Sequence, residues 1–141
     1  MTGRCFVDTN VLVYADDRSA GPKRYQARKL IQDVMRTKTG VLSLQVLQEY
    51  FAVATRKLGI SAESARRRVE LLGRLDVVIL GVQDLLTAID LHRLHGFSIW
   101  DALVIRAALN AGCRVIYSED LQEGRRLEGL EVVNPFRDSP K

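Results

Sequence analysis

The sequence predicts an α/β fold in which helices cover both faces of a parallel sheet. Five short segments rich in apolar and β-branched residues are typical of buried strands, and segments with helical periodicity separate all five. Strands that alternate with helices in this way favour a parallel sheet. The expected strands are Arg4–Val7, Gly40–Ser43, Asp76–Leu80, Cys113–Tyr117 and Glu131–Val133.

Start and stop signals bound the helices between these strands. Pro22 is typical of a helix start, and glycines such as Gly59 and Gly96 are typical of helix ends. The segment over 100–111 is apolar nearly all round, which predicts a buried helix. We expect helices after Pro22, over 44–58, from Ser61, over 83–95 and over 100–111.

We interpret the whole chain, residues 1–141, as a single domain. Its 47% hydrophobic content is enough for one substantial core, and no repeat or Pro/Gly/Ser-rich linker divides it. The longest apolar runs, such as Val77–Leu80, are too short to span a membrane, and the segment before Asp8 has no room for the core of a signal peptide. We therefore expect a cytoplasmic protein.

Cysteine usage and charge narrow the class of function. Cys5 and Cys113 each begin an apolar strand-like run, which favours reduced, buried thiols over a disulfide or a zinc site. The chain carries 21 Lys and Arg against 17 Asp and Glu, a net charge of +4. If four acids are held at a metal site, the rest of the molecule is more basic still. Such a charge distribution suits a polyanionic substrate cut by bound cations.

Four acids stand at element ends, where parallel sheets bind their ligands. Asp8 ends the first strand, and Asp120 follows the strand that ends at Tyr117. Glu49 and Asp101 lie near the starts of helices whose other residues are mostly apolar. Because ligands of open α/β sheets bind beyond the carboxyl ends of the strands, we expect these acids to converge.

Each acid also has an ordinary structural explanation. Asp8 could cap the next helix, and Ser98 with Asp101 matches the capping-box pattern. Glu49 could be a solvated residue on an amphipathic helix, and Asp120 could belong to a turn. Taken together, however, clustered carboxylates repel one another unless cations neutralise them. Their convergence therefore favours a metal site.

The expected ligands indicate which metal would bind. Oxygen ligands without accompanying His or Cys select hard cations, Mg²⁺ or Mn²⁺ rather than zinc. His92 and His95 have no third nitrogen or sulfur ligand near them in sequence, and they fit a helix C-terminus instead. Carboxylate-held cations can activate a water and stabilise both oxygens of an in-line phosphodiester displacement. Such chemistry needs no side-chain nucleophile.

Several motifs, in order and spacing, resemble those of the PIN-domain family, and in particular its VapC toxins. They are Phe6–Leu12, Glu49, Ser98–Ala102, Tyr117–Leu121 and the closing Val133–Phe136. The resemblance covers nearly the whole chain. It implies a three-layer fold with strand order 3-2-1-4-5, Mg²⁺- or Mn²⁺-dependent RNA cleavage, homodimers, and neutralisation by a cognate antitoxin.

The resemblance also implies roles for individual residues. It gives catalytic and metal-binding roles to Asp8, Glu49, Asp101 and Asp120. Asn10 and Ser118 match the polar positions around these ligands. Glu119 stays an alternative to Asp120, because either of the two adjacent acids could face the metal.

Basic residues that follow the first strand are candidates for binding substrate phosphates. We expect these contacts from Arg18, Lys23 and Arg24, with Arg28 and the run Arg66–Arg68 as weaker candidates. An antitoxin segment that bears Arg or Lys could enter the acidic pocket, displace the cations and fill a groove between the early helices.

Other α/β families fit the sequence less well. A haloacid-dehalogenase-type phosphatase needs a second Asp where Asn10 stands, and a receiver domain needs an acid where Gly81 follows the third strand. Rossmann and P-loop proteins need a Gly-rich turn that this sequence lacks. The remaining alternative is a non-catalytic PIN-like domain that binds nucleic acid or a partner and whose acids hold a structural ion.

Overall fold

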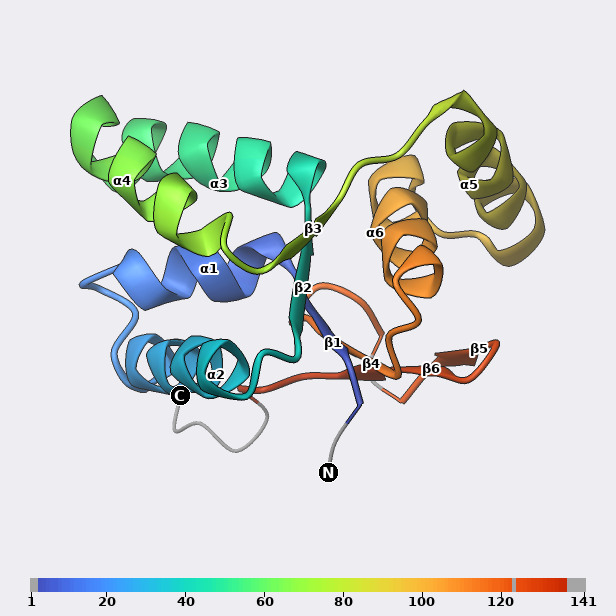
Figure 1. Cartoon of the computed structure of the whole chain (residues 1–141), viewed down its shortest axis with the longest axis horizontal. Helices are drawn as coiled ribbons and strands as arrows, with labels where there is room; N and C mark the ends of the chain where they lie inside the picture. The colour runs from blue at the N-terminus through green and yellow to red at the C-terminus, as the bar shows by residue number, and fades with distance from the viewer. Residues whose placement is uncertain (1–2, 123, 137–141) are drawn as a thin grey trace.

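A six-stranded sheet forms the centre of the protein, in a computed structural model that describes residues 3–122 and 124–136 (Figure 1). The strands are β1 (Cys5–Val7), β2 (Gly40–Ser43), β3 (Asp76–Val78), β4 (Val115–Tyr117), β5 (Arg126–Leu127) and β6 (Leu130–Val133). Their order is β3-β2-β1-β4-β6-β5, and only the pairing of β5 with β6 is antiparallel. The predicted α/β class with a mainly parallel sheet is confirmed.

The observed strand order differs from the predicted order 3-2-1-4-5 by one added strand. The five predicted strands keep their order as β3-β2-β1-β4-β6, and β5 extends the sheet beyond β6. Glu128 and Gly129, with φ values of 50° and 84°, form the turn that folds β5 against β6. This hairpin was not predicted, because Glu-Gly lacks the Asn-Gly or Asp-Gly signal of such turns.

Helices cover both faces of this sheet. They are α1 (Thr9–Asp16), α2 (Pro22–Thr37), α3 (Leu44–Arg56), α4 (Ala62–Leu72), α5 (Val82–His95) and α6 (Ile99–Asn110). Figure 1 shows α1 to α4 on one side of the strands and α5 with α6 on the other. Ser43, Ser61 and Ser98 cap three of these helices through their side chains. None of the helices described is both long and apolar enough to cross a membrane.

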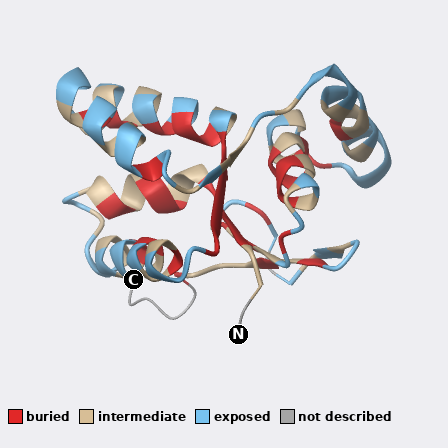
Figure 2. Cartoon of the chain, in the orientation of Figure 1, coloured by how far each residue is buried: buried red, intermediate tan, exposed pale blue. Residues whose placement is uncertain are grey.

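The hydrophobic core lies between the sheet and the helices (Figure 2). Every residue of β1 is buried, and α6 buries five residues, as its sequence predicted. Trp100, in the first turn of α6, is an exception at 62% exposed. Cys5 and Cys113 are free, buried thiols, as expected. Burial raises the pKa of Cys113 to about 12, which keeps this thiol protonated and unreactive.

The register of the central strands brings distant segments to one edge of the sheet. Val7 of β1 is paired with Tyr117 of β4, so the residues that follow the two strands emerge side by side. The Asp8 backbone N–H donates to the Tyr117 carbonyl at 3.0 Å, which extends the pairing by one step. Asp8 and Ser118 are therefore neighbours in space although 110 positions separate them.

Candidate active site

Asp8 is a buried acid at the end of β1. Its side chain is held by the Thr9 backbone N–H at 2.8 Å and by the Ser118 hydroxyl at 2.7 Å, and only 7% of the residue is exposed. Burial raises its pKa to about 6 against the opposing effect of those two hydrogen bonds, and the charges of Asp120 and Asp101 raise it further. Asp8 therefore caps α1 and also lies within electrostatic reach of two other acids.

Ser118 is the buried centre of this edge of the sheet. Its hydroxyl donates to Asp8, and its oxygen accepts from the backbone N–H groups of Asp120 at 3.2 Å and Leu121 at 3.3 Å. A single hydroxyl thus ties the end of β1 to the turn that follows β4. The sequence analysis placed Ser118 among the polar residues around the site, and the structure places it in contact with both acids' segments.

Asn10 forms a second link between the same two segments. Its amide nitrogen donates to Asp120 Oδ2 at 3.1 Å, and its Oδ1 accepts from the Glu119 backbone N–H at 3.2 Å. Because Asn10 lies in the first turn of α1, its hydrogen bond fixes the position of the Asp120 carboxylate relative to that helix. An Asp at this position would repel Asp120 instead of donating to it.

Glu119 and Asp120 point to different partners, although they are adjacent. The Glu119 carboxylate accepts from the Tyr14 hydroxyl and from Lys23, both at 2.6 Å. Partial burial alone would raise its pKa, but these two hydrogen bonds hold the pKa below its usual range. Both Glu119 oxygens are engaged in this way, so the geometry favours Asp120 as the acid that faces Asp8.

Asp101 lies in the first turn of α6, which Ser98 caps. The Ser98 hydroxyl accepts from the Asp101 backbone N–H at 3.1 Å. Burial raises the pKa of the Asp101 carboxyl, and the Asp120 charge adds to this effect, while a hydrogen bond with Ser98 opposes it. Asp8, Asp101 and Asp120 therefore come from three separate parts of the chain, and the charge of Asp120 raises the pKa of both other acids.

Glu49 is the outlying member of the predicted set. It is exposed on α3 and accepts a hydrogen bond from the Gln45 side chain at 2.9 Å. It shares a groove of about 1120 Å³ with Asn10 and Asp120, whereas Asp8 and Asp101 are not part of the lining of that groove. Across residues 3–122 and 124–136, no three His, Cys, Asp or Glu side chains stand close enough to enclose an ion.

A comparison of the whole chain with known families decides its class. The model of the PIN domain matches residues 5–127. The chain belongs to the PIN domain family. No curated protein sequence matches it.

Solved structures share the fold of this PIN domain. Mycobacterium tuberculosis VapC20, described as a sarcin-ricin loop cleaving toxin, superposes with a TM-score of 0.65 at 15% identity, over 82% of this chain and 89% of that chain. A toxin-antitoxin complex from Klebsiella pneumoniae gives 0.68 at 18% identity, over 93% and 97%. DNA-bound VapBC from Salmonella typhimurium gives 0.66 at 19% identity, over 95% and 99%.

The residues of this PIN domain fit a divalent cation in their chemistry. The acids that gather at the strand ends offer only oxygen atoms, which hard cations prefer. Thr9 Oγ1, in the residue that follows Asp8, is buried and has no hydrogen-bond partner among the residues that the structure describes. Burial raises the pKa values of Asp8 and Asp101, and the charge of Asp120 raises both further, so a bound cation would offset both the burial and the repulsion of these charges.

The groove beside these acids runs along α1 and the hairpin of α3 and α4. Its lining carries more acids than bases, and it has an apolar wall. The acids are Asp16, Asp17, Glu49 and Asp120, the bases are Arg18 and Lys57, and the apolar wall is Val13, Val53, Leu58 and Ile60. The groove therefore offers both charged and apolar contacts to a ligand.

The three cations predicted to bind substrate lie in different surroundings. Arg18 is exposed and lines the groove. Lys23 is engaged with Glu119, and its ammonium lies over the Tyr14 ring, 5.0 Å from the centroid. Arg24 lines a separate depression on α2. Of the three, only Arg18 borders the groove that holds Asp120.

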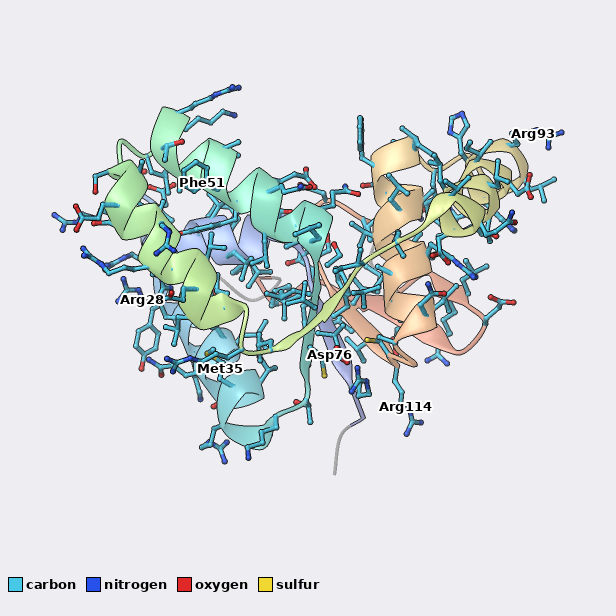
Figure 3. All side chains as sticks on the ribbon, turned by 45° about the horizontal axis from the view of Figure 1, so that its top comes forward. Arg28, Met35, Phe51, Asp76, Arg93 and Arg114 are labelled. Atoms are coloured by element: carbon cyan, nitrogen blue, oxygen red, sulfur yellow. The ribbon has the colours of Figure 1, made fainter. Side chains whose placement is uncertain are left out.

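The weaker candidates are occupied with structural contacts. Arg28, labelled in Figure 3, donates to the Ala15 carbonyl at 2.6 Å and lies 3.8 Å from Asp16. Arg68 lies 3.3 Å from the same carboxylate, and the Tyr50 hydroxyl donates to it as well. Asp16 is thus a junction where side chains from α2, α3 and α4 meet α1.

Proposed function

We propose that this PIN domain is an endoribonuclease that uses Mg²⁺ or Mn²⁺ to hydrolyse RNA phosphodiester bonds, and that it is the toxin of a toxin–antitoxin pair. The observation that carries the proposal is that Ser118 and Asn10 tie Asp8 and Asp120 together at adjacent strand ends, with Asp101 of α6 near enough for its charge to affect Asp8. Family membership and the fold of the VapC toxin structures support it.

In this proposal Asp8, Asp101 and Asp120 hold the cation, and Glu49 contributes from the wall of the groove. A divalent cation bound there supplies an activated water and neutralises charge at the scissile phosphate. Asp8 is mostly ionised at neutral pH, since its pKa is about 6. The carboxylate of Asp8 is thus negatively charged at the pH at which it would bind the cation.

Two polar side chains position the acids for this role. Ser118 donates to Asp8 and fixes the backbone of Asp120, while Asn10 donates directly to the Asp120 carboxylate. Glu119 is held away by Tyr14 and Lys23, so in the proposal it orients the turn and does not bind the cation. Such supporting hydrogen bonds typically change metal affinity or activity by about 10- to 100-fold when they are removed.

Cleavage of RNA by the purified chain tests this proposal. We expect cleavage with Mg²⁺ or Mn²⁺, no cleavage in EDTA, and a loss of at least about 100-fold in kcat for Asp101→Asn. Asp90→Asn is the matched control, because Asp90 is an exposed acid of α5 that pairs with Arg93 of the same helix. An intact RNA substrate under all these conditions would favour the alternative of a non-catalytic binding domain.

We also propose that a basic antitoxin segment closes the groove. Its Arg or Lys residues would pair with the four acids in competition with the cation, and its apolar residues would contact the wall formed by Val13, Val53, Leu58 and Ile60. Toxin–antitoxin complexes among the structural neighbours support a partner of this kind. Rescue of growth by the product of the adjacent upstream gene, with a co-purifying complex, tests it. Growth unimpaired by this chain alone would contradict the toxin role. The homodimer and the cytoplasmic location stay predictions.

A further inference from the structure

The outer face of α2 carries a basic and aromatic surface outside the proposed cleavage site. A depression of about 560 Å³ on this face is lined by Arg24, Tyr25, Arg28 and Lys29, together called the α2 patch, and also by Gly21, Gln32 and Asp33. Asp33, the acid of this lining, lies 3.7 Å from Arg36. Residues four apart lie on one face of a helix, so Arg24 stands beside Arg28 and Tyr25 beside Lys29. Tyr25 is 74% exposed, which leaves its ring open to a partner.

Two cations of the α2 patch, Arg24 and Lys29, differ in their pairing from the arginines of α4, whereas Arg28 lies 3.8 Å from Asp16. Each arginine of the run 66–68 lies within 4 Å of a carboxylate, at 3.9, 3.1 and 3.3 Å. In the part of the chain that the structure describes, Arg24 and Lys29 make no ion pair, and Arg24 Nε is buried without a hydrogen-bond partner. The positive charges of Arg24 and Lys29 are therefore available to an anion, whereas those of the three α4 arginines are largely neutralised.

The α2 patch begins next to the edge of the proposed site. Lys23 precedes Arg24 and pairs at 2.6 Å with Glu119, the neighbour of Asp120 in the chain. The first turn of α2 is thereby fixed to the turn that carries Asp120. Arg24 and Tyr25 follow Lys23 directly in the same helix, so the α2 patch begins one residue after this contact.

We propose that the α2 patch binds single-stranded RNA as an anchoring surface for the substrate, with Arg24 and Lys29 on phosphates and one base stacked on Tyr25. Cations interleaved with an exposed aromatic ring are the usual means of holding single strands, and an unstacked base is available only in a single strand or loop. The inference rests on the proposed ribonuclease function and adds a binding surface to it.

Fluorescence anisotropy with a labelled, unstructured RNA of about 12 nucleotides tests the α2 patch. The full chain carries Asp101→Asn and is kept in EDTA, so that binding is measured without cleavage. Tyr25→Ala should weaken binding at least about fivefold, and Tyr25→Phe should restore it. Arg24→Gln with Lys29→Gln should reduce the slope of log K against log salt by about 1.4.

Matched controls separate this inference from the proposed function. Arg67→Gln, on α4, removes a cation already paired with Glu63 and should leave the slope unchanged. If wild-type protein cleaves RNA while the Tyr25 and Arg24/Lys29 variants bind it normally, the α2 patch is refuted and the ribonuclease stands. The α2 patch is also refuted as an RNA-binding surface if these variants keep RNA binding and lose binding to an acidic protein partner. If no RNA is bound or cut, both proposals fail.

Discussion

Replacement of Asp8 by Asn should stabilise the metal-free protein at neutral pH. The pKa of Asp8 rises from 3.8 to about 6 in the folded state, so above pH 6 its ionisation costs the fold about 3 kcal/mol relative to the unfolded chain. Asn carries no charge, but it offers Thr9 and Ser118 one acceptor in place of two, a loss of about 1 kcal/mol. We expect a net gain of about 1–2 kcal/mol in the free energy of unfolding.

The sign of the pH dependence distinguishes this explanation from a packing effect. Because the folded-state pKa is raised, the folded protein binds the extra proton between pH 3.8 and about 6, and stability is lost as pH rises through that window. Lowering the pH from about 7.5 to about 4.5 should therefore stabilise wild type by about 2 kcal/mol more than Asp8→Asn.

Urea denaturation in EDTA at these two pH values measures both quantities. Addition of Mg²⁺ or Mn²⁺ at neutral pH should then stabilise wild type and leave Asp8→Asn almost unchanged, since a ligand stabilises only the state that binds it. If Asp8→Asn is destabilised in EDTA and shows the same pH dependence as wild type, the argument from buried charge repulsion is wrong.

Three further predictions concern the surroundings of the acids. Ser118→Ala should lower the free energy of unfolding by about 1–3 kcal/mol, because two backbone N–H groups and the Asp8 carboxylate lose a partner; urea denaturation measures this, and an unchanged midpoint would contradict it. Calcium should protect the protein against unfolding yet support little RNA cleavage, because its longer and looser coordination misplaces the attacking water; turnover equal to that with Mg²⁺ would refute this. Arg18→Gln should flatten the salt dependence of RNA binding by about 0.7 in slope, since Arg18 lines the groove beside Asp120, and an unchanged slope would make it a surface charge only.

Local patterns were enough to predict the main elements of the fold. The apolar runs of β1 and β2 are short and buried along their whole length, and β4 is buried at its centre, so these runs lack the polar face of an amphipathic helix. Serine caps and closing glycines gave the helix ends for the same reason, because their geometry is local. The β5–β6 hairpin was not predicted, because its turn has positive φ angles at both Glu128 and Gly129, and a positive φ angle is not expected for a Glu residue.

The proximity of two predicted site residues could be predicted from the sequence, whereas the hydrogen-bond partners of the site residues could not. The convergence of Asp8 and Asp120 follows from parallel strand ends, which is a rule of topology. The choice between Glu119 and Asp120 depends on Tyr14 and Lys23, which lie far from both in sequence. The different surroundings of Arg18 and Arg24 likewise depend on how α1 and α2 turn against each other, which no sequence spacing fixes.

The location of a bound Mn²⁺ ion tests the central claim most directly. A crystal of the full chain grown with Mn²⁺ should show an anomalous difference peak bounded by the carboxylates of Asp8, Asp101 and Asp120, with Glu119 still held by Lys23. The peak should be absent in Asp101→Asn crystals and present in Asp90→Asn crystals. A protein that cleaves RNA while its Mn²⁺ ion lies away from these three acids would contradict the account.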